Sequence, residues 1–272
     1  MSDSTFKNNY GYWVIVVGSA EGLGEAYTIA LAKRKMNLIL VDNQLNLLEA
    51  ISKKVETDFG VKTVKLYLDL KDVNAVEKMM LEIEKVDCRL LIYNAAYSLV
   101  KPFLNHNEVE LDNYIDVNTR TQLKLAHQFS KLLICKKQAG GILLMSSLAG
   151  LIGMQLVSTY AATKAFTWNL AEALHYELKP KNIKVMACIA GATATPAYLK
   201  TKPTYGFIKP QIMSPIDVAE SALQNLGKKA LLIPGFSNRF NYFILTRLLP
   251  RKMAASVANK TMLTMFQEQS NS

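Results

Sequence analysis

The chain reads YWVIVVGSAEGLG over residues 12–24, an apolar run that leads into a loop with glycine at positions 18, 22 and 24. A continuous β-branched run such as residues 14–17 is typical of a strand buried on both faces of a parallel sheet. Glycines at a strand-to-helix turn let the backbone turn tightly and approach a pyrophosphate, whose charge the N-terminus of the next helix favours. This stretch therefore predicts a dinucleotide site in the first βα unit of an α/β protein.

Short apolar runs alternate with longer amphipathic segments through most of the chain, which is the pattern of repeated βα units. One α/β domain is therefore expected over residues 1–272, with a Rossmann-like, doubly wound parallel sheet of about seven strands and helices on both faces. Strands are expected at about 12–17, 37–41, 62–68, 89–93, 141–146, 183–189 and 230–233. Helices are expected at 22–35, 43–58, 72–85, 112–138, 158–178 and 215–226.

Two segments of the last third are expected to elaborate this domain rather than to form a second one. Prolines at positions 196, 203, 210 and 215 favour a mobile loop over a helix, so residues 194–214 are expected to form a substrate loop or lid. Residues 236–272 carry a helical pattern and are expected to form a C-terminal helical elaboration.

The charge of the chain is unevenly placed. Its 272 residues carry 32 Lys and Arg against 22 Asp and Glu, a net charge of +10, and half of them are apolar, which excludes a disordered chain. Residues 1–177 hold 19 charges of each sign, whereas residues 178–272 hold 13 basic and 3 acidic side chains. The excess of the last third indicates either a solvated basic face or contact with an anionic partner.

The positions of the cysteines and histidines argue against a disulfide-bonded protein and against a metal site. Cys88, Cys135 and Cys188 are widely spaced within apolar runs, so neither a disulfide framework nor a CxxC site is expected. The three histidines have no metal-ligand spacing, so no metal is expected. No uncharged apolar stretch reaches 18 residues, and the start has no basic n-region. A cytoplasmic protein is expected, with peripheral placement at a membrane surface as an option.

Acidic residues at strand ends bear on the choice of cofactor. Asp42 lies 24 positions after Gly18, where a carboxylate can accept both hydroxyls of the adenosine ribose and repels a 2′-phosphate. Glu21 adds a second negative charge, so NAD(H) is favoured over NADP(H). Two alternatives stay open, because a basic residue of 33–35 could fold back and Asp42 could be a turn or N-cap residue. Asp69, after the third strand, could bond the adenine amino group or cap a helix.

A tyrosine, a lysine and a serine form the reactive constellation. Tyr160 and Lys164 lie four residues apart at the start of a helical segment, so both fall on one helix face. A fixed ammonium beneath a phenol lowers its pKa towards neutral pH, as acid–base catalysis requires. Ser147 ends the fifth strand, so its hydroxyl should point into the same crevice as the glycine loop and could hold a carbonyl oxygen. Ser146 is the alternative, although its side chain should face the other way.

With these motifs in order, the sequence resembles the short-chain dehydrogenase/reductase family from the first strand to at least Thr195. The resemblance implies that Tyr160 is the general acid in reduction and the base in oxidation. Ser147 would orient and polarise the carbonyl. Lys164 would lower the pKa of the phenol and bind the nicotinamide ribose. Asn118 would hold a water that links the lysine to solvent as a proton relay.

The resemblance also implies the extent of the cofactor site. Asn94 would stabilise the crevice, and Thr195 with residues 189–191 would grip the nicotinamide end. The residues expected to bind the cofactor are Gly18, Ser19, Ala20, Glu21, Gly22, Leu23, Gly24, Asp42, Asn43, Asp69, Leu70, Asn94, Ala95, Ala96, Tyr160, Lys164, Gly191, Thr193 and Thr195.

The expected activity is hydride transfer between NAD(P)(H) and a hydrophobic secondary alcohol or ketone. Tyr198, Leu199, Tyr205 and Phe207 give the expected lid an apolar to aromatic character that suits such a substrate. One alternative is a non-catalytic dinucleotide-binding or scaffold protein. Another is a lipid 3-oxoacyl reductase associated with a membrane or an acyl carrier, whose substrate would be an anionic or acyl compound.

Three kinds of partner follow from the pattern. The resemblance implies a homodimer or homotetramer contact at the helical segments 112–138 and 158–178. The apolar residues of 236–265, with basic side chains at one side, could rest on an anionic membrane surface or dock an acidic acyl carrier. The same segment could instead pack over the substrate pocket or across a subunit interface. No recognition motif accompanies the basic residues, so nucleic acid is not expected as a partner.

Overall fold

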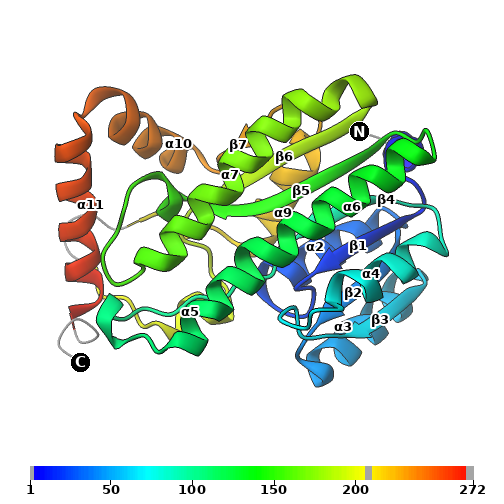
Figure 1. Cartoon of the computed structure of the whole chain (residues 1–272), viewed down its shortest axis with the longest axis horizontal. Coiled ribbons are helices and arrows are strands. Elements are labelled where there is room, and N and C mark those ends of the chain that lie inside the picture. The colour runs from blue at the N-terminus through cyan, green and yellow to red at the C-terminus, as the bar shows by residue number, and fades with distance from the viewer. Residues whose placement is uncertain (1–2, 206–209, 268–272) are drawn as a thin grey trace.

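The structure, a computed structural model, describes residues 3–205 and 210–267. Seven parallel strands form one sheet in the order β3-β2-β1-β4-β5-β6-β7, which confirms the expected single α/β domain with a Rossmann-like fold (Figure 1). The strand order reverses between β1 and β4, where such sheets bind ligands. The strands are β1 (Trp13–Val17), β2 (Asn37–Asp42), β3 (Thr63–Tyr67), β4 (Cys88–Tyr93), β5 (Gly140–Ser147), β6 (Ile183–Ala190) and β7 (Leu231–Leu232).

Helices connect the strands and cover the sheet. Most of them follow the expected alternation, and the last two come after β7 at one end of the molecule (Figure 1). The α-helices are α1 (Asp3–Tyr10), α2 (Gly22–Lys33), α3 (Leu45–Phe59), α4 (Ala75–Glu84), α5 (Glu108–Ile115), α6 (Thr121–Cys135), α7 (Ser158–Leu178), α8 (Pro196–Lys200), α9 (Pro215–Asn225), α10 (Phe236–Phe243) and α11 (Arg251–Met265).

Both faces of the sheet are buried, because successive residues of each strand point to opposite sides. Val14 and Val16 of β1 pack with α2, α3 and α9 on one face, whereas Ile15 and Val17 pack with α4, α6 and α7 on the other. All four side chains are fully buried. An uninterrupted apolar run is therefore what a central parallel strand requires.

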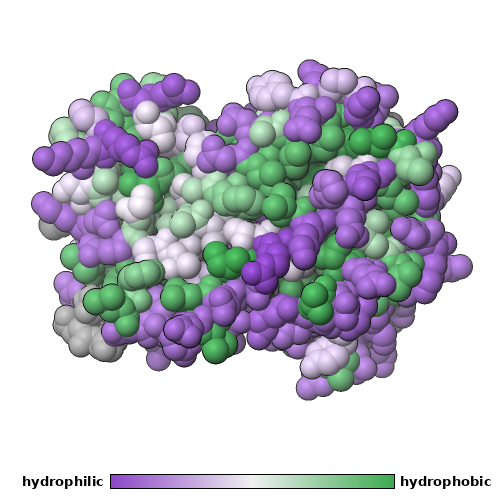
Figure 2. Space-filling view, in the orientation of Figure 1, coloured by the Kyte–Doolittle hydropathy of each residue, from purple (hydrophilic) through white to green (hydrophobic). Residues whose placement is uncertain are grey.

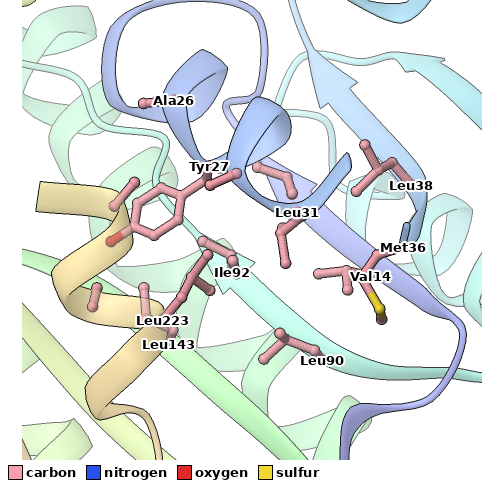
Figure 3. Packing of buried hydrophobic residues seen from close by; sticks show 14 of the residues in the cluster. Val14, Ala26, Tyr27, Leu31, Met36, Leu38, Leu90, Ile92, Leu143 and Leu223 are labelled. Carbon is pink, nitrogen blue, oxygen red and sulfur yellow. The ribbon is translucent and has the colours of Figure 1, made fainter. Parts of the chain in front are cut away.

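One aromatic side chain links several elements of the first face. Tyr27 of α2 belongs to the same buried cluster as Leu223 of α9 and Leu143 of β5 (Figure 3). Its hydroxyl lies 3.1 Å from the Sδ atom of Met145, near the end of β5. The helix that follows the glycine loop is thereby held against the strand that carries the predicted serine.

The prediction of one continuous helix over residues 112–138 was wrong in two respects. The helix begins earlier, at Glu108, because Asn107 and Glu110 form a capping box in which each side chain accepts a hydrogen bond from the other residue's backbone N–H. It is also interrupted by a π-helical segment, η2 (Asp116–Arg120), between α5 and α6. A π turn inserts one extra residue and commonly marks a functional site. Helix 158–178, in contrast, is confirmed as α7.

Other boundaries also differ. The expected helix 22–35 ends at Lys33 because Lys35 adopts a positive φ of 58° and its ammonium donates to Phe59 O. Helix α1 was not expected, since few of its residues are apolar, yet it packs against β4 and β5 with Phe6 and Tyr10 buried. The proline-containing segment 194–214 includes the short helix α8, with Pro196 in its first turn, so its first part is not all loop.

The expected C-terminal elaboration consists of α10, the π-helical segment η5 (Ile244–Leu248) and α11. Ala254, Ala258 and Met262 form the buried stripe of α11 and pack against residues 151–160. Asn259 fixes the same helix, because its side chain donates to Gly153 O and accepts from Gln155 N. Among the described residues, none of the helices combines the length and the apolar character needed to cross a membrane.

Candidate active site

A cavity of about 680 Å³ lies at the carboxyl ends of the strands. Residues that follow β1, β2, β3, β4, β5 and β6 all contribute to its wall, because parallel strands end at the same edge of the sheet. The opposite end of the cavity is closed by α8, α10 and α11. A single space therefore runs from the glycine loop, past the predicted tyrosine, to the C-terminal helices.

The glycine loop is built around close backbone approaches. Gly18 has a φ of 76°, and a Cβ there would lie 2.6 Å from the Cα of Ala95. A Cβ on Gly24 would lie 1.7 Å from the carbonyl oxygen of Gly18. Asn94 holds that same carbonyl, because its Nδ2 donates to Gly18 O at 2.7 Å. The turn is therefore compact enough for a phosphate-bearing ligand to approach the backbone.

Asp42 lies on the cavity wall and also supports the loop. Its Oδ2 accepts from Ala20 N at 2.9 Å, and its Oδ1 accepts from Gln44 N at 3.1 Å. Burial raises the pKa of this carboxyl above its usual value, backbone hydrogen bonds lower it, and the charge of Glu21 raises it. The turn role that was left open for Asp42 thus coexists with a place at the cofactor end of the cavity.

The basic residues that follow α2 point elsewhere. Arg34 forms a bidentate ion pair with Glu220 of α9 and donates to Ala30 O. Lys35 reaches Phe59 O at the end of α3. Among the described residues that line the cavity, Lys164 is the only lysine or arginine. Neither Arg34 nor Lys35 is therefore placed to meet a ribose 2′-phosphate beside Asp42.

Ser147 and Tyr160 meet at the centre of the cavity. Their side chains form a hydrogen bond, and the Oγ of Ser147 also accepts from Ala149 N at 3.2 Å. Burial raises the pKa of the Tyr160 phenol, and the bond to Ser147 partly lowers it. Ser146 faces the other way, as predicted, because its Oγ donates to Lys164 O at 2.7 Å.

Lys164 is buried next to the Tyr160 ring. It is only 3% exposed, its Nζ donates to Met145 O at 2.9 Å, and it lies 5.5 Å from the centroid of the Tyr160 ring. Burial lowers the pKa of this ammonium to about 8. Burial is the largest cause of the shift at the Tyr160 phenol and Lys164 is not among its causes, so the expected lowering of the phenol pKa by the lysine stays a prediction.

Asn118 lies in the π-helical segment η2 behind the cavity wall, and its side chain joins three elements. Its Nδ2 donates to Tyr97 O at 2.9 Å and to Thr163 Oγ1 at 3.0 Å, and its Oδ1 accepts from Tyr97 N at 2.7 Å. Both amide hydrogens are therefore in use. Thr163, which no motif singled out, lies on α7 next to Lys164 and connects η2 to the helix of the tyrosine.

The predicted residues after β6 fall on the same wall. Thr193 Oγ1 donates to Gly191 O at 3.0 Å, and Thr195 caps α8 by accepting from Tyr198 N. A Cβ on Gly191 would lie 2.6 Å from Asn238 Nδ2, so a side chain there would displace the Asn238 amide. Asp69 also lines the cavity; it forms a local turn with Lys71 and does not cap α4, whose N-cap is Asn74.

Most of the predicted site therefore gathers at one place. Four predicted residues are not on the cavity wall and act from behind it: Ser19, Ala20, Gly24 and Asn118. The others line it: Gly18, Glu21, Gly22, Leu23, Asp42, Asn43, Asp69, Leu70, Asn94, Ala95, Ala96, Ser147, Tyr160, Lys164, Gly191, Thr193 and Thr195.

The sequence did not single out individual side chains of the far end of the cavity. Asn238, Asn241 and Tyr242 of α10 and Leu245 of η5 reach the wall, together with side chains at the end of α11. The C-terminal helices thus pack over the cavity, which is one of the placements that the sequence left open. Tyr205 donates to or accepts from the hydroxyl of Tyr198 at 2.9 Å, whereas Phe207 lies outside the described residues.

The arrangement fits a dinucleotide. Gly18 and Gly22 leave the backbone open where a Cβ would crowd Ala95 or Thr195, and carboxylates stand at the end of β2. A serine and a tyrosine lie further along the same space. Together these features define the class of the protein, a nicotinamide-dependent oxidoreductase with a Rossmann-like fold.

Comparison with known proteins identifies the family. The family model described as "short chain dehydrogenase" matches residues 12–205, so the chain belongs to this family. It is accordingly a short-chain dehydrogenase/reductase enzyme that acts on CH–OH groups with NAD(P).

Individual relatives cover most of the chain. A 7beta-hydroxysteroid dehydrogenase from Clostridium sardiniense is 31% identical over 86% of this chain and 89% of its own length. A very-long-chain 3-oxoacyl-CoA reductase from Vanderwaltozyma polyspora is 30% identical over 83% of this chain and 67% of its own length. A solved structure reported for 7beta-hydroxysteroid dehydrogenase stereoselectivity shares the fold, with a TM-score of 0.85, 23% identity, and 93% and 98% of the two chains covered.

Gly24→Ala tests the compact loop. The added Cβ would overlap Gly18 O, so the loop must shift, and we expect the affinity for NADH to fall about tenfold or more and the melting temperature to drop by several degrees. Fluorescence titration and thermal unfolding measure these effects. Gly153→Ala is the control, because a Cβ there meets nothing within 4 Å. Unchanged NADH affinity in Gly24→Ala would contradict the assignment of this loop to the cofactor.

Proposed function

We propose that this protein interconverts a bulky, hydrophobic secondary alcohol and its ketone, with NAD(H) as the cofactor. The observation that supports this most is the shape of the cavity, which joins the glycine loop and Asp42 at one end to the Ser147–Tyr160 pair and an apolar chamber at the other. A cofactor and a substrate can therefore meet next to the one phenol that is held by a serine.

Tyr160 is proposed as the proton donor to the ketone. Its raised pKa keeps the phenol protonated at neutral pH, which suits a general acid in the reduction. In the oxidation the same group would have to accept a proton, so the rate of the oxidation should increase at higher pH. The bound nicotinamide supplies or takes up the hydride. Ser147 would hold the carbonyl oxygen beside the phenol, to which it is already hydrogen-bonded.

Lys164 and Asn118 are proposed to act beside the phenol. With a pKa of about 8, Lys164 is mostly protonated at neutral pH and can donate to a ribose hydroxyl while it keeps Met145 O. For Asn118 we propose a positioning role, because its side chain holds Tyr97 and Thr163 in place. A relay water would then bind mainly to a backbone carbonyl of η2, where the π turn disturbs the regular helix ladder.

The substrate class follows from the far end of the cavity. Ile152, Met154, Leu245, Met262 and Phe266 line it, and the described lining residues there carry no charge. Such walls favour a neutral apolar skeleton, either fused rings or a long chain. The similar 7beta-hydroxysteroid dehydrogenase suggests a substrate with fused rings, and the similar very-long-chain 3-oxoacyl-CoA reductase suggests one with a long chain. We favour the ring compound, since the lining gives a thioester's phosphates no cation.

Tyr160→Phe tests the proposed chemistry. The variant keeps the ring but loses the proton, so we expect turnover of hydroxysteroid alcohols to fall at least about a thousandfold while NADH still binds. Tyr176→Phe is the matched control, because Tyr176 lies on the same helix with 68% of its surface exposed. Substantial residual turnover in Tyr160→Phe would exclude the assigned role. A parallel assay with 3-oxoacyl-CoA separates the two substrate classes.

The preference for NAD(H) over NADP(H) is proposed from charge. Asp42 and Glu21 stand on the cavity wall, and Arg34 and Lys35 are engaged elsewhere. A ribose 2′-phosphate would therefore meet negative charge with no cation among the described lining residues nearby. Two ribose hydroxyls can instead donate to the Asp42 carboxylate.

Asp42→Asn tests this preference. The amide oxygen can still accept from Ala20 N, so the loop should persist, but the charge is lost. We expect NADH affinity to fall about tenfold and NADPH affinity to rise, both measured by fluorescence titration. Asp58→Asn, at the exposed end of α3, is the control. A wild-type protein that binds NADPH more tightly than NADH would contradict the proposal.

We also propose that the enzyme is a homodimer or homotetramer, formed through α6 and α7. Large apolar side chains are exposed there, among them Leu123, Ile134 and Phe166. Figure 2 shows hydrophobic surface that runs along α7. Exposed apolar surface of this extent favours association.

Phe166→Arg is expected to shift the protein towards the monomer, since a charge would be buried at the contact. Sedimentation velocity measures the change. Tyr67→Arg, on the edge strand β3, is the control and should keep the wild-type distribution. A monomeric wild-type protein at micromolar concentration would contradict the proposed assembly.

A further inference from the structure

Helix α10 has two faces of different character. Because an α-helix has 3.6 residues per turn, Phe236, Phe240 and Phe243 fall on one face, and Asn238 and Tyr242 fall on the opposite one. The latter two line the cavity. The three phenylalanines point outwards and are 76%, 54% and 50% exposed. The cavity accounts for one side of the helix and leaves the other without a partner among the described residues.

The outward apolar surface continues past α10. Leu248 at the end of η5 and Met253 at the start of α11 are 58% and 55% exposed. Single exposed apolar side chains are normal on a protein surface, but five exposed large apolar side chains within residues 236–253 indicate a patch. We call the outward side chains Phe236, Phe240, Phe243, Leu248 and Met253 the aromatic ridge. In Figure 1, α10 and α11 stand at one end of the molecule, apart from the sheet.

Basic side chains accompany the ridge. Residues 230–267 contain five Lys and Arg and no Asp or Glu. Arg239, Arg247, Arg251 and Lys252 are all exposed, and within the described residues none of them forms an ion pair. Figure 2 shows hydrophobic and hydrophilic side chains next to each other over α10. Part of the excess positive charge of the last third of the chain therefore lies around the aromatic ridge.

We propose that this enzyme docks peripherally on an anionic lipid bilayer through the aromatic ridge, and that its substrate enters the cavity from the membrane side. Phenylalanines can insert between lipid headgroups while neighbouring arginines contact their phosphates. The second part rests on the proposed function, because only an apolar substrate would be concentrated in the bilayer.

The positive charge around the ridge favours an anionic bilayer over a second copy of this chain as the partner. A second copy would bring the same positive ridge against the first, and like charges disfavour that contact. An anionic membrane offers negatively charged headgroups to the basic side chains and an apolar interior to the phenylalanines. The described helices are too short or too polar to span it, so the contact is superficial.

The far end of the cavity, formed by α8, α10 and α11, lies next to the ridge. Tyr242 and Leu245 line the cavity, whereas their neighbour Phe243 belongs to the ridge. Tyr198 of α8 lines the cavity as well, and the next residue, Leu199, is 57% exposed. Thr204 ties the segment after α8 to α11 by donating from Oγ1 to Thr264 O at 2.9 Å. The elements that close the cavity are thus the ones that would face the bilayer.

Flotation with vesicles tests the docking. The full chain is mixed with phosphatidylcholine vesicles with or without phosphatidylserine, at low and at high salt. We expect the protein to float with the anionic vesicles at low salt, and to be released by salt, because screening weakens the arginine contacts. Absence of flotation with anionic vesicles at low salt would overturn the proposal, as would equal flotation with both kinds of vesicle at either salt.

Paired variants test the surface. Phe240→Ser with Phe243→Ser, and Arg247→Glu with Arg251→Glu, are each expected to lower vesicle binding about tenfold or more. Lys53→Glu with Lys54→Glu on α3 matches the charge change at a distant exposed site and should leave binding unchanged. NADH affinity and turnover of a water-soluble ketone show whether each variant is folded. Equal loss of binding in the α3 control would overturn the assigned surface.

One further variant separates this proposal from the proposed function. Tyr160→Phe should float like the wild type, because docking does not need the phenol. If it floats but the wild type reduces no ketone, the docking holds and the proposed function fails. If the wild type reduces ketones but does not float, the reverse is true. Binding of an acidic carrier protein without binding of vesicles would replace the bilayer as the partner.

Discussion

The parallel pairing of all seven strands is the constraint on which the rest of the structure depends. Parallel neighbours cannot be joined by tight turns, so helices make the connections and bury both faces of the sheet. Every strand then ends at the same edge. Gly18, Asp42, Asn94 and Ser147, which are far apart in the chain, therefore line one cavity.

Buried polar groups lie at the centre of this edge, and their pairing shapes the site. Lys164 is buried, pairs with no carboxylate among the described residues, and donates to the carbonyl of Met145. Removing water from an ammonium is costly, which explains why its pKa falls. Asn118 and Thr163 satisfy one another in the next layer and connect η2 to α7. Such a network favours one arrangement of the reacting groups.

The C-terminal helices lie beyond residues 12–205, the part of the chain that the family model matches. Their inner faces complete the apolar chamber, while their outer faces carry phenylalanines and arginines. Asn259 and Thr204 tie α11 to the loop after β5 and to the segment after α8. The same helices thus line the cavity on one side and face solvent on the other.

Local patterns in the sequence determined the sheet, the glycine turn, helix 158–178 and the Ser147, Tyr160 and Lys164 set, because apolar runs, turn glycines and helical spacing act between near neighbours. Other features rest on contacts between distant residues. The side chain of Asn118 is held by Tyr97 and Thr163, and burial raises the pKa of Tyr160. The direction of the Arg34 side chain depends on its ion pair with Glu220. These could be decided only by the tertiary structure, since no local pattern records which distant groups become neighbours.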